Sequence, residues 1–260
     1  MVRDLPDVLA RIVDSKRAAL PSLCASQDSL EARAAARTDF RDFRAGLLGK
    51  RPAIIAEVKK ASPSKGVFAD RFDPGAIARE YASGGAAALS VLTDAEFFRG
   101  SLSDLESARA AVAIPVLRKD FTLHEVHVLE AAAHGADAIL LIAALLDETE
   151  LRKLREFAAR HRMAALVEVH DETELDAAIG SGAEIIGVNN RNLHTFEVTL
   201  ETSLRLAGRI PSYAVKISES GIDSPAAIAR LQGAGFDAFL VGEHLMRAPD
   251  PAAALRSLLS

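Results

Sequence analysis

The chain has 260 residues, 49% of them hydrophobic, which is enough for one sizeable core and is a common length for a single α/β barrel. A formal net charge of -5 without long Lys/Arg runs excludes the basic surface that nucleic-acid binding requires, so we expect a small-molecule partner. No stretch has the uncharged apolar length of a secretory signal or a membrane span, so we expect a cytoplasmic protein that does not bind membranes.

Residues 1–48 are expected to form a helical extension in front of the first strand. Apolar side chains recur there at helical spacing: Leu5, Val8, Leu9, Ile12 and Val13. Because an apolar stripe is most often buried against a core, we expect the extension to pack on the body of the protein. A flap over a functional mouth is the alternative.

Residues 49–260 contain one repeated sequence pattern. In each copy a Gly ends a helix, and small residues followed by apolar residues begin a buried strand. The four copies start at Gly84, His134, Ser181 and Ala234, roughly fifty residues apart, which is about twice the length of a βα unit. Each interval must therefore hold one further strand. Apolar runs supply these strands at residues 52–58, 114–120, 163–169 and 213–220, so the sequence predicts eight strands.

Helix-starting signals separate the predicted strands: Asp73 with Pro74, Asp147, Asp171, and Ser224 with Pro225. Alternating strands and helices with short connections favour a single (β/α)8 TIM barrel, with a doubly wound open sheet as the alternative. A dinucleotide-binding open sheet would have a glycine fingerprint after its first strand, where this chain reads KKASPSKG. The segment GAGFDA, which starts at Gly233, has the residue types of that fingerprint, but it ends a helix and precedes a strand, the reverse of the required order.

Ionisable residues lie near the carboxyl ends of the first, third, fifth and seventh strands, where a buried strand should be apolar: Glu57, Lys59, Lys119, Glu168 and Glu219. The spacing of Glu57 and Lys59 places both on one face. Surface ion pairs would explain any one of these charges alone. Two lysines and three carboxylates at one rim instead predict a site whose groups shift each other's pKa values.

The loops at the same rim supply further candidates. Asn189 and Arg191 follow the sixth strand and offer an amide and a permanent cation, although turn chemistry also explains the asparagines there. A phosphate cradle is predicted after the last two strands, at Ser220, Gly221, Gly242 and Glu243. Ser62 and Ser64 would add hydroxyls, or would simply belong to an exposed loop. The histidines and Cys24 show no metal-site spacing, so we predict no metal.

Seven segments in order carry a family resemblance: IAEVKKASPSKG, SVLTDAEFFRGS, VLRKDF, LVEVH, IGVNNRNL, SESGI and VGEHLMR. From about residue 50 to residue 247 they closely resemble the indole-3-glycerol phosphate synthase family. Two departures are visible. Ser218 stands where Ala is commoner, and His244 stands where Ser is expected; both flank the predicted phosphate site.

The resemblance implies a carboxy-lyase of tryptophan biosynthesis that needs no cofactor. Its substrate, 1-(2-carboxyphenylamino)-1-deoxyribulose 5-phosphate, closes to indole-3-glycerol phosphate with loss of carbon dioxide and water. By resemblance, Lys119 is the general acid at the ketone oxygen, Glu168 handles the proton of dehydration, and Lys59 pairs with the anthranilate carboxylate. The sugar hydroxyls would meet Glu57, Glu219 and Asn189. A monomer or weak homo-oligomer is expected.

Apolar residues near the rim are candidates to sandwich the aromatic ring, with core packing as the alternative: Phe97, Phe121 and Leu193.

Three other functions compete with the main hypothesis. The isomerase of the preceding pathway step would carry a catalytic Cys at the end of the first strand, but Cys24 lies in the extension. A Schiff-base aldolase would use Lys119 as nucleophile. A non-catalytic phosphate-binding barrel would not need both Lys119 and Glu168.

Overall fold

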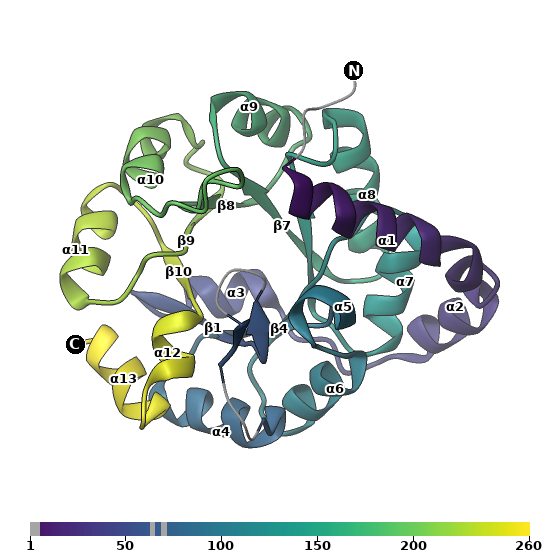
Figure 1. Cartoon of the computed structure of the whole chain (residues 1–260), viewed down its shortest axis with the longest axis horizontal. Helices are drawn as coiled ribbons and strands as arrows, with labels where there is room; N and C mark the ends of the chain where they lie inside the picture. The colour runs from purple at the N-terminus through teal and green to yellow at the C-terminus, as the bar shows by residue number, and fades with distance from the viewer. Residues whose placement is uncertain (1–5, 63–65, 69–71) are drawn as a thin grey trace.

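The computed structural model describes residues 6–62, 66–68 and 72–260, and in this part of the chain eight parallel strands close into a barrel (Figure 1). The barrel strands are β1 (Ala53–Val58), β4 (Ala88–Leu92), β5 (Val116–Lys119), β6 (Ala138–Ile142), β7 (Ala164–Val169), β8 (Ile185–Asn189), β9 (Val215–Glu219) and β10 (Ala238–Val241). Each pairs with its chain neighbours, and β10 pairs with β1 to close the ring. The predicted TIM barrel is confirmed, and the open sheet is excluded.

Helices surround this barrel: α4 (Pro74–Gly84), α6 (Leu102–Ala110), α7 (Glu125–Ala133), α8 (Glu148–Arg160), α9 (Glu172–Gly180), α10 (Glu201–Leu206), α11 (Pro225–Gly233) and α13 (Pro251–Leu258). The predicted helix starts are confirmed. The side chains of Asp73, Asp147, Asp171 and Ser224 each accept a hydrogen bond from the backbone N–H three residues later. These caps fix where each βα loop ends and therefore how far it extends over the barrel mouth.

Four short elements lie in the loops at the carboxyl ends of the strands: β2 (Ala61–Ser62), β3 (Gly66–Val67), α5 (Ala95–Phe98) and α12 (Glu243–Arg247). The sequence did not predict the small β2–β3 hairpin, because two-residue strands leave no periodicity to detect. These elements and the helix α1 (Asp7–Cys24) surround the entrance to the barrel interior (Figure 1).

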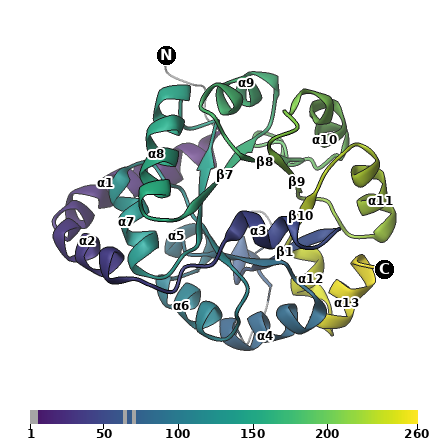
Figure 2. The ribbon, with the colours of Figure 1, turned by 180° about the vertical axis from the view of Figure 1, so that it is seen from behind.

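The predicted extension forms α1, α2 (Gln27–Ala36) and α3 (Phe43–Leu48). Helix α1 buries Leu9, Ile12 and Val13, whereas Leu5 lies outside the described residues. Helix α2 packs along α7. Helix α3 lies across the opposite end of the barrel from the mouth (Figure 2), where Phe43 and Leu47 pack among the interior side chains of the strands. The last helix of the extension therefore closes the base of the barrel core.

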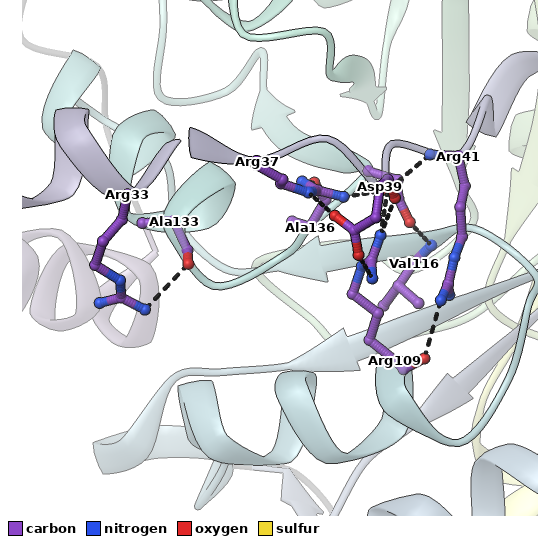
Figure 3. Close-up of polar contacts among 9 residues, drawn as sticks. Arg33, Arg37, Asp39, Arg41, Arg109, Val116, Ala133 and Ala136 are labelled. Atoms are coloured by element: carbon purple, nitrogen blue, oxygen red, sulfur yellow. Dashed lines mark hydrogen bonds and ion pairs between the residues drawn. The ribbon is translucent and has the colours of Figure 1, made fainter. Parts of the chain in front are cut away.

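A buried polar network ties the segment between α2 and α3 to the base of the barrel. Arg37 and Arg41 in this segment and Arg109 of α6 converge there (Figure 3). The fully buried side chain of Asp137 accepts hydrogen bonds from the guanidinium groups of Arg37 and Arg109 and from the backbone N–H of Arg41. Its other oxygen accepts from Val116 N at 3.0 Å, so the same carboxylate also fixes the start of β5.

Asp137→Ala should lower the free energy of unfolding by about 3 kcal/mol, because Arg37 and Arg109 lose a fully buried carboxylate and keep that of Asp39, which is 61% exposed. Asp237 occupies the equivalent place before β10 and accepts from Lys216 N at 3.0 Å. Its side chain is 18% exposed, so Asp237→Ala is the matched control, with an expected loss of about 1 kcal/mol. Urea denaturation of both variants measures the difference, and equal losses would contradict this account.

Candidate active site

The mouth of the barrel opens into a cavity of about 750 Å³. Four of its lining side chains come from alternate strands of the ring: Glu57 on β1, Lys119 on β5, Glu168 on β7 and Glu219 on β9. Alternate strands contribute side chains to one layer of a TIM-barrel interior, so these four groups form its topmost layer. The predicted convergence of charges from the odd-numbered strands is therefore present.

The strand period of two explains why these charges point inward. Two residues earlier on the same strands lie apolar side chains, each buried in the barrel interior: Ile55, Leu117, Leu166 and Ile217. The layer below the charged groups is therefore dry, and it separates them from water on that side. Burying charged groups above an apolar layer costs free energy unless opposite charges pair with one another. The groups of this layer must therefore form ion pairs.

Lys119 and Glu168 form the central ion pair, with Lys119 Nζ 3.2 Å from Glu168 Oε2. Burial lowers the pKa of Lys119, but the carboxyl groups of Glu168, Glu219 and Glu57 outweigh burial and raise that pKa above its ordinary value. Burial raises the pKa of Glu168, whereas Lys119 and His170 lower it, and the net pKa is lowered. At neutral pH this pair is therefore an ammonium and a carboxylate.

Glu219 is the exception among the carboxyl groups. Burial and the neighbouring charge of Glu168 raise its pKa well above the ordinary value, although its Oε2 lies 3.9 Å from Lys119 Nζ. Glu219 therefore holds a proton more readily than Glu57 or Glu168 does. Its Oε1 leaves no space for a side chain at Gly187, since a Cβ there would lie 2.1 Å from that oxygen. A side chain at position 187 would therefore displace the carboxyl group of Glu219 from its place in the cluster.

Glu57 and Lys59 form a second ion pair at the end of β1, as their predicted common face requires. Burial raises the pKa of Glu57, but Lys59 and Lys119 lower it, and the net shift is downward. The carboxylate of Glu57 occupies the space beside Gly242, where a Cβ would lie 2.4 Å from Glu57 Oε1. Gly242 therefore has a structural reason to be glycine in addition to the predicted approach of a phosphate.

All twelve site residues predicted from the sequence line this one cavity. Asn189 lies in it with its Oδ1 accepting hydrogen bonds from Ser220 Oγ at 2.9 Å and from Arg191 N at 3.0 Å. Ser220 and Gly221 both have positive φ, 68° and 76°, so the chain turns sharply after β9 and brings this loop against the mouth. The remaining members of the predicted set are also in the lining: Ser62, Gly242 and Glu243. Ser64 lies outside the described residues.

Helix α1 lines the cavity with Val8, Leu9 and Ile12, so the apolar stripe both packs on the protein and forms one wall of the mouth. Lys16 anchors this helix: its Nζ lies 2.6 Å from Asp120 Oδ1 and 3.0 Å from an oxygen of Asp94. The prediction treated packing and covering the mouth as alternatives. The structure shows both, since α1 contacts α7 and also lines the mouth.

Two details of the sequence-based interpretation need correction. Phe97 is not among the residues that line the cavity; Phe98 lines it instead, with its ring 6.1 Å from that of Phe121, which also lines it as predicted, as does Leu193. Ser218 was placed beside the phosphate site, but its buried hydroxyl bonds to Asn190 and Ser203 behind β9. The period of two turns Ser218 away from the mouth because Glu219 faces it.

Glu219→Gln tests the charge state of the cluster. A raised folded-state pKa means that the folded protein holds this proton more tightly than the unfolded chain does. The free energy of unfolding of the unsubstituted protein should therefore fall, relative to that of the variant, as the pH rises above the ordinary value of 4.5.

Thermal or urea unfolding of both proteins from about pH 4 to about pH 8 measures this difference. Glu156→Gln, on the outer surface of α8, is the matched control for loss of a carboxylate. A stability difference between the Glu219→Gln variant and the unsubstituted protein that stays constant or reverses its trend would show that Glu219 is ionised.

Within the described residues, no helix is long and apolar enough to span a membrane. In the same part of the chain, no group of three or more His, Cys, Asp or Glu side chains is arranged to hold a metal ion. An ammonium and several carboxyl groups with shifted pKa values around one cavity of a TIM barrel define an enzyme class: proton-transfer chemistry on a small molecule. A family model described as indole-3-glycerol phosphate synthase matches residues 9–258. The chain belongs to the indole-3-glycerol phosphate synthase family.

Relatives agree with this assignment, and a solved structure shares the fold. The chain is 49% identical over 262 residues to the indole-3-glycerol phosphate synthase of Leptothrix cholodnii, covering 98% of this chain and 100% of the relative. It is 49% identical over 257 residues to that of Burkholderia vietnamiensis, covering 96% and 98%. A thiamine phosphate pyrophosphorylase from Pyrococcus furiosus shares only the fold, with a TM-score of 0.60 and 17% identity over 80% of this chain and 94% of that chain.

Proposed function

We propose that this mouth catalyses the reaction for which the family is named: ring closure of 1-(2-carboxyphenylamino)-1-deoxyribulose 5-phosphate with loss of carbon dioxide and water. The observation that carries the proposal is the contact between the Lys119 ammonium and the Glu168 carboxylate, 3.2 Å apart inside one cavity. An acid and a base at one place are what a carbonyl addition followed by a dehydration requires.

Lys119 is the general acid in this proposal. As the aromatic carbon attacks the ketone, negative charge develops on the ketone oxygen, and a fixed ammonium both stabilises that charge and donates a proton. Glu168 then takes the proton from the carbon next to the ring nitrogen and returns it to the departing hydroxyl during dehydration. The lowered pKa of Glu168 keeps it ready as a base, since it is a carboxylate at rest.

Lys59 pairs with the carboxylate of the anthranilate part of the substrate, in exchange for its resting partner Glu57. Glu57, Glu219 and Asn189 supply hydrogen-bond partners for the sugar hydroxyls. A protonated Glu219 suits this role because a neutral carboxyl both donates and accepts hydrogen bonds.

The phosphate would lie at the backbone N–H groups of Gly221 and Gly242, with Ser220, Arg191 and Ser62 close by. The hydroxyl of Ser62 is buried and has no hydrogen-bond partner among the described residues, which leaves it ready for a ligand. Glu243 can contribute only its backbone, since its carboxylate would repel a phosphate and lies 3.2 Å from Arg247 Nε.

The aromatic ring of the substrate would lie against the apolar part of the lining, which includes Phe98, Phe121, Leu193 and Ile12. A monomer or weak homo-oligomer is expected. That oligomeric state and the cytoplasmic location stay predictions.

The rival functions fit this geometry less well. A Schiff-base mechanism needs a neutral amine, whereas the surrounding carboxyl groups raise the pKa of Lys119 and keep it an ammonium. The isomerase would need a cysteine at the end of β1, where Glu57 and Lys59 stand; Cys24 is exposed at the end of α1. A protein that only binds phosphate would have no use for the buried acid–base pair.

Lys119→Ala should reduce indole formation at least about 100-fold while substrate binding survives, because only the acid is removed. Indole fluorescence after mixing the pure protein with the substrate measures turnover, and isothermal titration with a non-reacting analogue measures binding. Lys153→Ala, on the outer surface of α8, is the matched control and should leave turnover unchanged. Normal turnover of the Lys119→Ala variant would refute the proposed role.

A further inference from the structure

In the proposed reaction the enzyme gives up one proton in every turnover. The inference that we draw from this loss rests on the proposed function. The substrate carboxylate leaves as neutral carbon dioxide, so its negative charge disappears and one proton must be taken up from water. Lys119 gives its proton to the ketone oxygen, which later leaves as water. Glu168 takes one proton from carbon and returns one to the hydroxyl, so its count is unchanged. Lys119 alone ends the turnover as a neutral amine, and it must be reprotonated (reloaded) before the next turnover.

A continuous row of proton-carrying groups leads away from Lys119 through the wall of the barrel. Lys119 Nζ lies 3.2 Å from Glu168 Oε2, and the other oxygen of that carboxylate, Oε1, lies 3.4 Å from His170 Nε2. The second ring nitrogen of the histidine, Nδ1, lies 2.9 Å from Glu174 Oε2. His170 directly follows β7, and Glu174 is one helical turn further along, on α9.

The row connects two different cavities. Glu168 lines the cavity of the mouth, whereas His170 and Glu174 line a neighbouring cavity of about 670 Å³ between the loops that follow β6, β7 and β8. His170 Nε2 is buried and has no hydrogen-bond partner within the described residues. At rest it faces Glu168 Oε1 as an ion pair at 3.4 Å without a hydrogen bond, so this is the step of the row at which a proton transfer must bring the two atoms closer.

We propose that His170 and Glu174 relay a proton from the second cavity to Glu168 and so reload Lys119. The imidazolium of His170 gives its Nε2 proton to Glu168 Oε1. The carboxyl group of Glu168 then rotates and gives the same proton to the Lys119 amine. The neutral ring, still protonated at Nδ1, then rotates so that Nε2 takes up a proton from the water of the second cavity, and it rotates back between Glu168 and Glu174. One proton enters from water, and every group returns to its starting state.

The charges around His170 support an imidazolium at rest. Burial lowers the pKa of His170, but the hydrogen bond to Glu174 and the charge of Glu168 outweigh burial and raise the pKa, against a smaller opposing effect of Lys119. The second cavity adds charged and titratable groups of both signs: Asp171, Arg191, His194, Glu197 and Arg205. The relay also avoids the mouth, which the substrate occupies during turnover. His170 acts through Glu168 and is therefore a positioning residue.

The variant His170→Asn separates reloading from ring closure. Its first turnover should proceed at the rate of the unsubstituted protein, because Lys119 starts protonated. Steady-state turnover should fall about 10- to 100-fold and recover as imidazole is added to the buffer. Rapid mixing with substrate, followed by indole fluorescence, measures both phases. Glu174→Gln, which keeps the fold of the histidine loop, should also lower the steady-state rate without changing the first turnover.

The variant His134→Asn is the matched control, since His134 Nδ1 also lies 2.7 Å from a glutamate, Glu106 Oε1, at a place away from both cavities. It should leave both phases unchanged. Unchanged steady-state turnover in both His170→Asn and Glu174→Gln would overturn the relay and leave the proposed function standing. Equal loss of both phases without rescue by imidazole would also overturn it, as a purely structural effect. No indole from the unsubstituted protein would instead refute the proposed function.

Discussion

The ion pair between Lys119 and Glu168 is the interaction on which the rest of the site depends. Glu168 is buried and Lys119 is largely buried in the top layer of the barrel, and the apolar layer beneath them excludes water from below. Because a buried ammonium is unfavourable without carboxylates, the negative charges of Glu168 and Glu57 are needed to keep Lys119 protonated. The same crowding raises the pKa of Glu219 while the pKa of Glu168 is lowered, so the carboxyl groups of the cluster differ in how readily they take up a proton.

The backbone around this cluster is shaped to make room for it. Glycine at 187 and at 242 leaves space for the carboxyl groups of Glu219 and Glu57, and both positions follow from the register of neighbouring strands. The N-terminal helices complete the structure at both ends. Helix α3 closes the base of the core, and α1 forms an apolar wall of the mouth, fixed by Lys16 to the loop that follows Lys119.

Local signals in the sequence were enough to predict the barrel and the polar half of its mouth. Helix caps and the alternation of apolar runs depend on a few neighbouring residues. The strand period places Glu57 and Lys59 on one face, and the charges at the ends of otherwise apolar strands suggested that this face is the interior. The resemblance to a known family added the chemical roles.

The errors and omissions concern features that depend on distant contacts. An apolar stripe shows that a face of α1 is buried but not against what, so its place at the mouth was left open. The rotation of the four-residue helix α5 is set by packing, which is why Phe98 rather than Phe97 reaches the cavity. His170 stood in the quoted segment LVEVH, and its position one residue beyond a strand end was the available signal.

The central claim is that Lys119 acts as an ammonium on the ketone oxygen beside the Glu168 carboxylate. A crystal structure with an unreactive analogue, in which the ketone is reduced to an alcohol, tests this claim most directly. The account predicts that Lys119 Nζ lies within hydrogen-bond distance of that alcohol oxygen, with the phosphate at the N–H groups of Gly221 and Gly242. An analogue bound with its alcohol oxygen out of reach of Lys119 would contradict the account.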